Sequence, residues 1–287
     1  MRQLFPWLFP APAKAVPLSS DIFAAIDHAP LIEHPYPHLV VEDAVPRAIA
    51  DAFLAEMPSL EVLCADQPPR SNVRFPLPSP QALADPRISE AWKATLRTCL
   101  DASQSFLDKT LNRLGRHLLE TFPDFEARFG PIDKLRAVPR YGPRARNGVG
   151  MDAQIVVNSP PLVDGTKVRG PHLDVPNKLI SALLYLRRKD DDSVGGELEL
   201  YEPAGGEVLF NEVNGVVRGQ VRNVRSYPYR HNLMILPLVT PLGLHAAARE
   251  RGPNGRATTC TLSARCRRCC STFHMSKGRQ APNPSRA

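Results

Sequence analysis

Apolar residues in the first half of the chain recur with the spacing of amphipathic helices. The longest such segment covers residues 85–122, where Asp85 can cap the first turn and Pro86 can occupy it. A break in the pattern at 101–103 divides this segment into two predicted helices. Further helices are predicted over 46–57 and over 124–129, the second of which ends at Gly130. The apolar positions of the long segment are Ile88, Trp92, Leu96, Leu100, Leu107, Leu111, Leu114 and Leu118.

From about residue 134 the helical spacing gives way to short apolar runs that are separated by Gly, Pro, Asn and Asp. The runs occupy 154–158, 179–186, 197–202, 206–210 and 232–238, and a further short strand is predicted at 38–41. Strands of this length between turn-forming residues are typical of an antiparallel sandwich or barrel. Because the helices precede most of the strands, the pattern predicts an α+β fold with the helices packed on one face of a β core.

The same pattern suggests where the domain begins and ends. Residues 1–33 are expected to form a loosely structured lead-in, and 34–258 the domain, with helices over about 46–129 and the β core over about 134–258. Residues 259–287 form a basic, Cys- and Arg-rich tail without periodicity, which is expected to be disordered. A reading-frame error near the 3′ end would produce the same loss of pattern. Cys266 and Cys269 have the spacing of zinc ligands, but the neighbouring sequence is too polar to fold around a metal.

Composition changes this picture little. Hydrophobic residues make up 43% and charged residues 23% of the chain, as in soluble globular proteins, and no apolar run is long enough for a membrane span. The net charge of +7 is confined to the end of the chain: residues 249–287 hold nine Lys or Arg and one acidic residue, a net of +8, which leaves −1 for residues 1–248. The distribution therefore indicates no specific nucleic-acid partner. Only Cys64 and Cys99 lie outside the tail, so a reduced, cytoplasmic protein is expected.

Candidate chemistry is concentrated at His172 and Asp174. Residues i and i+2 of a strand point to the same face, so the imidazole and the carboxylate would lie side by side. His245 follows Asp174 by 71 positions, which is enough chain for the strands to return beside the first pair. Two histidines and one carboxylate on one face of an iron leave three coordination positions open. His231 stands near the same strand as His245 and is the alternative third ligand.

The segments VRGPHLD (168–174), LLYLRRKDDDSVGGELELY (183–201) and LGLHAAARERGPNGR (242–256) resemble the 2-oxoglutarate/Fe(II)-dependent oxygenase superfamily. The opening HPYPHLVVEDAVP (34–46) is also similar to the start of such domains, and bacterial members related to the prolyl 4-hydroxylase branch are the most similar in character. The resemblance covers roughly residues 34–258. It implies a double-stranded β-helix (jelly roll), with Fe(II), 2-oxoglutarate and O₂ as cofactor and co-substrates and ascorbate as an optional reductant.

The resemblance also implies roles for individual residues. His172 and Asp174 match the proximal metal ligands and His245 the distal ligand. Arg256, eleven residues after His245, matches the residue that pairs with the far carboxylate of 2-oxoglutarate, a task for which the planar guanidinium is suited. Arg249 is the alternative for that role, and Tyr141 matches an aromatic residue that helps to hold the co-substrate.

The implied reaction is hydroxylation of an unactivated C–H bond of a small-molecule or peptidyl substrate, with release of succinate and CO₂. Nothing in the sequence selects one substrate. The sequence departs from the family pattern after Arg256, where a closing strand is expected and the Cys- and Arg-rich tail begins. That departure keeps an alternative open, in which the chain is a catalytically inactive jelly-roll binding protein with a degraded C-terminal end.

Overall fold

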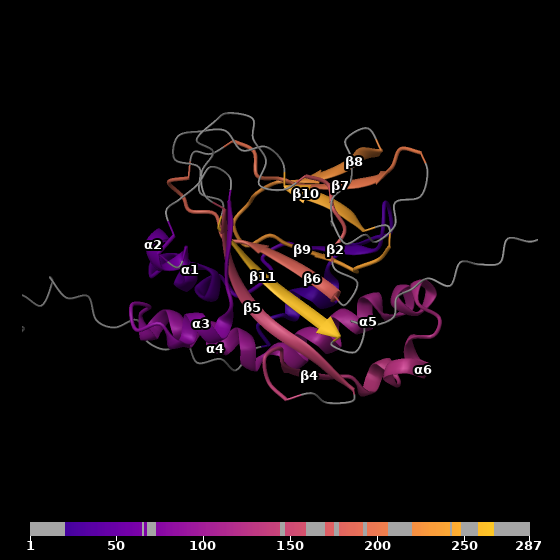
Figure 1. The fold of residues 1–287 in the computed structure, drawn as a ribbon, viewed down its shortest axis with the longest axis horizontal. Helices are drawn as coiled ribbons and strands as arrows, with labels where there is room; N and C mark the ends of the chain where they lie inside the picture. The colour runs from indigo at the N-terminus through magenta and orange to yellow at the C-terminus, as the bar shows by residue number, and fades with distance from the viewer. Residues whose placement is uncertain are drawn as a thin grey trace, which may run out of the picture.

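A computed structural model describes residues 21–64, 66–67, 73–143, 147–158, 170–174, 178–191, 194–205, 220–241, 243–247 and 258–266. For residues 247 and 258–266 it describes the backbone alone. A layer of helices, a large β-sheet and a small β-sheet lie on top of one another, with the large sheet in the middle (Figure 1). The expected combination of helices and a β core, with the helices on one face, is therefore confirmed.

The helical layer follows the predicted periodicity closely. The long apolar segment forms two helices that meet at Ala102, as the break in its pattern predicted. The last helix ends at Gly130, which adopts a φ of 88° that favours glycine. In the described residues the helices are α1 (Arg47–Ala55), α2 (Leu60–Leu63), α3 (Ser79–Ala84), α4 (Glu90–Asp101), α5 (Ser103–Thr121) and α6 (Phe125–Phe129), with 3₁₀ turns η2 (Ala24–His28) and η3 (Ile132–Lys134).

The start of α4 differs from the prediction. Ser89, and not Asp85, caps this helix, because its hydroxyl accepts a hydrogen bond from the backbone N–H of Trp92. The Asp85 carboxylate instead accepts from the backbone and the guanidinium of Arg87, and these bonds lower its pKa to about 2. Serine and aspartate are both common N-cap residues. Ser89 is the cap here because its hydroxyl bonds to the helix, whereas the Asp85 carboxylate bonds to Arg87.

The large sheet has the strand order β1-β2-β9-β6-β11-β5-β3, and β4 runs parallel to one end of β5. All its other strand pairs are antiparallel. Its strands are β1 (Leu31–Ile32), β2 (His38–Val41), β3 (Arg74–Leu77), β4 (Arg136–Pro139), β5 (Gly148–Asn158), β6 (Lys178–Tyr185), β9 (Met234–Pro237) and β11 (Thr258–Cys266). The short strand predicted at 38–41 is confirmed as β2.

The small sheet has the order β10-β7-β8, formed by β7 (Leu198–Pro203), β8 (Val221–Tyr227) and β10 (Leu244–Ala247). An isolated antiparallel bridge joins His172 to His245 and so places the segment 170–174 beside β10. From β5 onward the chain goes to this segment, returns to β6, forms β7 and β8, and returns again to β9 before β10 and β11. It thus passes repeatedly between the two sheets.

Two hydrophobic clusters separate the layers. The larger cluster lies between the helices and the large sheet and contains Trp92 and Phe53, whose rings meet edge to face at 5.5 Å. The second cluster joins Tyr185 and Ile235 of the large sheet to Leu198 and Leu200 of the small sheet. The large sheet is consequently buried on both faces, which explains why the run at 179–186 is apolar almost throughout and does not alternate.

Strand β11 corrects the expected end of the domain. The domain was expected to end at 258 and residues 259–287 to be disordered, but Thr258–Cys266 form a strand in the middle of the large sheet. Its backbone pairs with β5 on one side and with β6 on the other. A central strand takes its hydrogen bonds from both neighbours, so it needs no amphipathic pattern of its own. Residues 267–287, with Cys269 of the candidate zinc motif, lie outside the described residues, as does the run at 206–210.

The expected lead-in also has more structure than its sequence suggested. Phe23 and Ile26 of the segment 21–33 are fully buried in the larger cluster, and the Phe23 ring packs against Phe106 at 5.1 Å. The segment forms η2 and β1, elements of five and two residues that are too short to show a period. Residues 1–20 lie outside the described residues. Among the helices that the structure describes, none has the length and apolar character needed to cross a bilayer.

The position of β11 predicts different outcomes for two truncations. A chain that stops after Cys266 should keep its cooperative unfolding transition, because it retains the whole central strand. A chain that stops after Ala257 should lose that transition, because β5 and β6 would both be left with an unpaired edge. Thermal unfolding followed by circular dichroism checks both. Equal melting temperatures for the two chains would show that β11 contributes nothing to stability.

Candidate metal centre

The bridge between His172 and His245 brings together two segments that are far apart in the sequence. The backbone N–H of His172 donates to the carbonyl of His245 over 3.0 Å, and the N–H of His245 donates to the carbonyl of His172 over 3.1 Å. The two imidazole rings lie on the same side of this bridge, with their centroids 4.4 Å apart. His172 is buried and His245 is half-buried. The backbone pairing alone therefore fixes the spacing of the two rings.

Each ring is also oriented by its own segment. Nδ1 of His172 lies 2.9 Å from the carbonyl oxygen of Gly170, and Nδ1 of His245 lies 3.1 Å from that of Gly243. A carbonyl oxygen can only accept a hydrogen bond, so Nδ1 carries the proton in both neutral rings. The lone pair is then on Nε2, which is the ring atom that can bind a metal. A backbone carbonyl behind each ring is the support that metal-binding histidines usually have.

Asp174 completes the cluster. Its side chain is 12% exposed, and Lys178 Nζ lies 2.9 Å from its Oδ2. Burial by itself would raise the pKa of this carboxyl group, but neighbouring positive charge, above all that of the Lys178 ammonium, holds it well below its usual value. Asp174 is therefore a carboxylate at neutral pH, as a metal ligand must be.

His172, Asp174 and His245 offer ligand atoms that all lie within 4.8 Å of one another. In the part of the chain that the structure describes, these two histidines and one aspartate form the cluster that could hold a metal ion. Two imidazole nitrogens and one carboxylate oxygen suit a divalent transition metal, and three protein ligands leave coordination positions open. The residues present thus fit the iron that the resemblance implies.

Tyr36 was not among the candidate residues predicted from the sequence. It supports the strand that carries His245. Its hydroxyl donates to the carbonyl of Leu244, next to His245, over 3.2 Å. Nδ1 of His38 in turn donates to the carbonyl of Tyr36, and its Nε2 accepts from the hydroxyl of Tyr227. Burial, and then the charge of Asp174, raise the pKa of Tyr36 well above its usual value, so the phenol stays neutral and remains a donor. Only the motif HPYPH (34–38) could have drawn attention to it.

The alternative third ligand does not join this cluster. His231 Nε2 lies 3.4 Å from Oδ1 of Asp51 in α1, and its side chain is 30% exposed. The structure thus brings His245, and not His231, to the His172–Asp174 pair. Arg249 and Arg256 lie outside the described residues.

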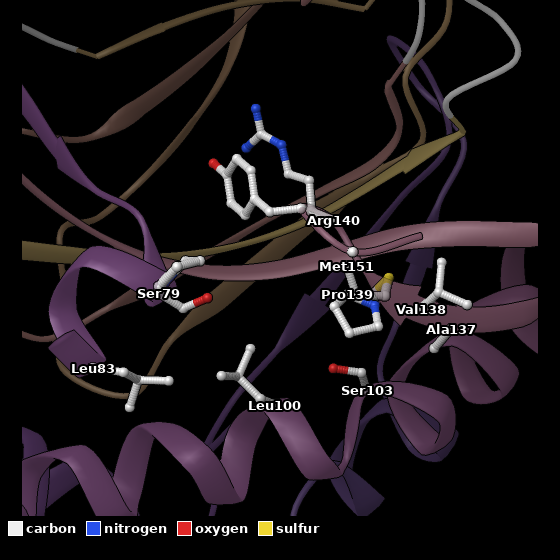
Figure 2. A pocket seen from close by; sticks show the side chains of 12 residues that line it. Ser79, Leu83, Leu100, Ser103, Ala137, Val138, Pro139, Arg140 and Met151 are labelled. Carbon is white, nitrogen blue, oxygen red and sulfur yellow. The ribbon is translucent and has the colours of Figure 1, made fainter. Parts of the chain in front are cut away.

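Tyr141 lies beside a cavity that contains none of the three candidate ligands. The cavity has a volume of about 450 Å³ and lies between α3, α4 and the β4 edge of the large sheet. Figure 2 shows Leu83 and Leu100 on its helical side and Arg140 on the strand side. Tyr141 is 48% exposed, and its described contacts are with Arg140 and with Gln154.

The chain matches no protein-family model and no curated protein sequence. It is similar to the solved structure of a prolyl-4-hydroxylase from Pseudomonas putida, with 13% identity over 79% of this chain and 91% of that chain and a TM-score of 0.42. It is also similar to a putative 2OG-Fe(II) oxygenase family protein from Caulobacter crescentus, with 12% identity over 84% of this chain and 79% of that chain and a TM-score of 0.43. It is also similar to a prolyl hydroxylase from Trichoplax adhaerens in complex with a peptide fragment (11%, 81% and 84%, TM-score 0.43). The likeness is distant, so the metal centre has to be judged on its own geometry.

The position of Tyr36 predicts that Tyr36→Phe weakens metal binding about 10-fold, since the strand that carries His245 loses a buried hydrogen bond. The same change should lower the free energy of unfolding by about 1 kcal/mol. Tyr229→Phe is the matched control, because the buried Tyr229 hydroxyl also donates to a carbonyl, that of Leu186. It should cost similar stability and leave metal affinity unchanged. Titration with Mn(II) and chemical unfolding measure the two quantities, and equal metal affinities for both variants would contradict the role of Tyr36.

Proposed function

We propose that the protein is a non-haem Fe(II)- and 2-oxoglutarate-dependent dioxygenase. His172, Asp174 and His245 would hold the iron through Nε2, one carboxylate oxygen and Nε2. The observation that carries the proposal is the convergence of these three side chains, within 4.8 Å, from segments 71 residues apart. Both rings are turned so that the unprotonated nitrogen is available to the metal. The complete ligand set with its supporting hydrogen bonds favours this proposal over a catalytically inactive binding protein.

The two sheets form, in this proposal, the double-stranded β-helix of such enzymes. The repeated passage of the chain between the sheets supports it, as does the bridge that places 170–174 beside β10. The metal ligands would then all come from the small-sheet side, and the large sheet would close the other side of the site. The aromatic cluster around Tyr185 and Tyr227 would keep water out of the space between the sheets.

Fe(II) together with 2-oxoglutarate and O₂ supplies an oxidant that can functionalise an unactivated C–H bond, with release of succinate and CO₂. Hydroxylation of a small-molecule or peptidyl substrate is the proposed outcome, and ascorbate would serve to keep the iron reduced. The chain's own part is to hold Asp174 ionised, to orient both imidazoles, and to bind the far carboxylate of 2-oxoglutarate. Arg256 is proposed for that last task, with Arg249 as the alternative and Tyr141 as an additional co-substrate contact.

The function is tested by metal content and succinate release. His172→Ala, Asp174→Ala and His245→Ala should each lower bound Fe(II) and abolish 2-oxoglutarate-dependent succinate formation, because each removes one of three ligands. The matched control is His231→Ala, whose side chain lies beside Asp51 and outside the cluster. It should keep both properties. Each protein is loaded with Fe(II) without O₂, and its bound metal is measured. A coupled assay with O₂ present then measures succinate release. Full iron content in all three ligand variants would refute the assignment.

Arg256 stands two residues before β11, and β11 lies in the middle of the large sheet. This location supports the proposal that Arg256 begins the returning strand. Arg249 follows β10 and precedes the sequence GPNG (252–255), whose residue types favour a turn. A charge-assisted pair with a carboxylate contributes about 2–3 kcal/mol, so Arg256→Ala should raise the KM for 2-oxoglutarate roughly 30- to 150-fold. Iron affinity should barely change. A large rise in KM for Arg249→Ala alone would transfer the role to Arg249.

A further inference from the structure

Arg140 is a largely buried cation whose guanidinium donates no hydrogen bond within the part of the chain that the structure describes. Its side chain is 16% exposed, and its Nη1 is buried. Nη1 lies 3.7 Å from Oδ2 of Asp152, which makes an ion pair but is too long for a hydrogen bond. Oδ2 is also without a hydrogen-bond partner, since the hydroxyl of Ser79 bonds to Oδ1. A guanidinium has five N–H donors, and buried donors are normally used.

The backbone fixes where this side chain starts. A turn follows β4, in which the N–H of Gly142 donates to the carbonyl of Pro139 over 3.0 Å. The N–H of Arg140 donates to the carbonyl of Met151 in β5 over 2.8 Å. The guanidinium then stacks on the ring of Tyr141, with Cζ 5.0 Å from the ring centroid. Its N–H bonds lie in its own plane, so stacking uses the face of the guanidinium and leaves the donors at its edge available.

Arg140 lines the cavity of about 450 Å³ beside α3, α4 and β4. This volume lies within the range of small-molecule sites, roughly 300–1,000 Å³. Figure 2 shows the Arg140 side chain extending from the strand side away from Leu83 and Leu100, so the lining is apolar at the helical end and basic at the other. Tyr141, at the basic end, is 48% exposed, so a ligand can enter there. The apolar part of the lining includes Pro80, Leu83, Leu100, Val138, Pro139 and Met151.

A carboxylate fits the unused donors of Arg140. Its two oxygens match the fork of a guanidinium, and the hydrogen bonds between them are charge-assisted. A ligand cation would be repelled by Arg140, and a phosphate would bring more negative charge close to the carboxylate of Asp152. The helical end of the cavity favours hydrocarbon, because apolar surface is removed from water there. A molecule with one carboxylate at one end and an apolar chain behind it therefore matches both ends of the cavity.

We propose that this cavity binds a small apolar monocarboxylic acid, with the carboxylate on Arg140 and the hydrocarbon part between α3, α4 and β4. The site is separate from the candidate metal centre, because its lining contains none of His172, Asp174 and His245. The inference goes beyond the proposed oxygenase function and does not depend on it.

The test is isothermal titration calorimetry of the full chain with octanoate, octanamide and hexanoate. Octanamide should bind roughly 10- to 100-fold more weakly than octanoate, because the amide cannot form the charge-assisted pair with Arg140. Hexanoate should bind about tenfold more weakly than octanoate, because two fewer CH₂ groups are buried at the apolar end. The first comparison reports on the basic end of the cavity and the second on its apolar end.

Three variants locate the bound acid. Arg140→Met should weaken octanoate roughly 10- to 100-fold and leave octanamide nearly unchanged. Ser103→Leu adds hydrocarbon to the cavity wall and should weaken both compounds alike. Arg136→Met is the matched control, because it removes an exposed arginine of the same strand that lies outside the lining, and it should change neither affinity. If Arg140→Met does not fold, as judged by circular dichroism, Arg140→Gln takes its place.

Each contrary result overturns the inference in a defined way. Failure of the unaltered protein to bind octanoate would refute the site. Equal affinities for octanoate and octanamide would show that Arg140 does not select a carboxylate. His172→Ala should leave the octanoate affinity unchanged, whatever it does to bound iron. Octanoate binding that is lost in His172→Ala and kept in Arg140→Met would place the acid at the metal centre instead.

Discussion

Two backbone hydrogen bonds between His172 and His245 are the constraint on which the rest of the site depends. They join a segment that precedes β6 to a strand that follows β9, and they set the distance between the two imidazole rings. The backbone carbonyls of Gly170 and Gly243 then orient the rings, since each accepts a hydrogen bond from Nδ1 of one histidine. The proposed metal centre therefore needs no rearrangement to receive an ion, because both ring nitrogens that would donate to it are held in place beforehand.

The layered fold gives this bridge a rigid background. The large sheet packs against the helices on one face and against the small sheet on the other, so its strands cannot shift without breaking two cores. β6 delivers Lys178 to Asp174, and β9 leads directly into the turn before His245. The hydrogen bonds from Tyr227 through His38 and Tyr36 to Leu244 tie the small sheet to the first strands of the chain. The site is thus supported from elements at both ends of the sequence.

Electrostatics inside the site differ from what the ligand set alone would suggest. Asp174 is a buried carboxylate that stays ionised because a buried ammonium accompanies it. Burying either charge alone would be costly, and burying both with good hydrogen bonds is tolerated. Within the pair the opposite charges of Asp174 and Lys178 compensate each other. The overall charge of +7 has no bearing on this local balance, because the last 39 residues carry +8 and the rest of the chain −1.

The sequence by itself determined the features that depend on neighbouring residues. The periodicity of residues 85–122 placed α4, α5 and the break at Ala102, because a helix is made of contacts between residues three and four apart. The spacing of His172 and Asp174 brought two candidate ligands together for the same kind of reason. Tertiary structure alone decided that β11 is a central strand, that His245 and not His231 completes the cluster, and that Lys178 and Tyr36 belong to the site. Each of these depends on partners far along the chain or on which way a strand turns, and a local pattern carries no information about either.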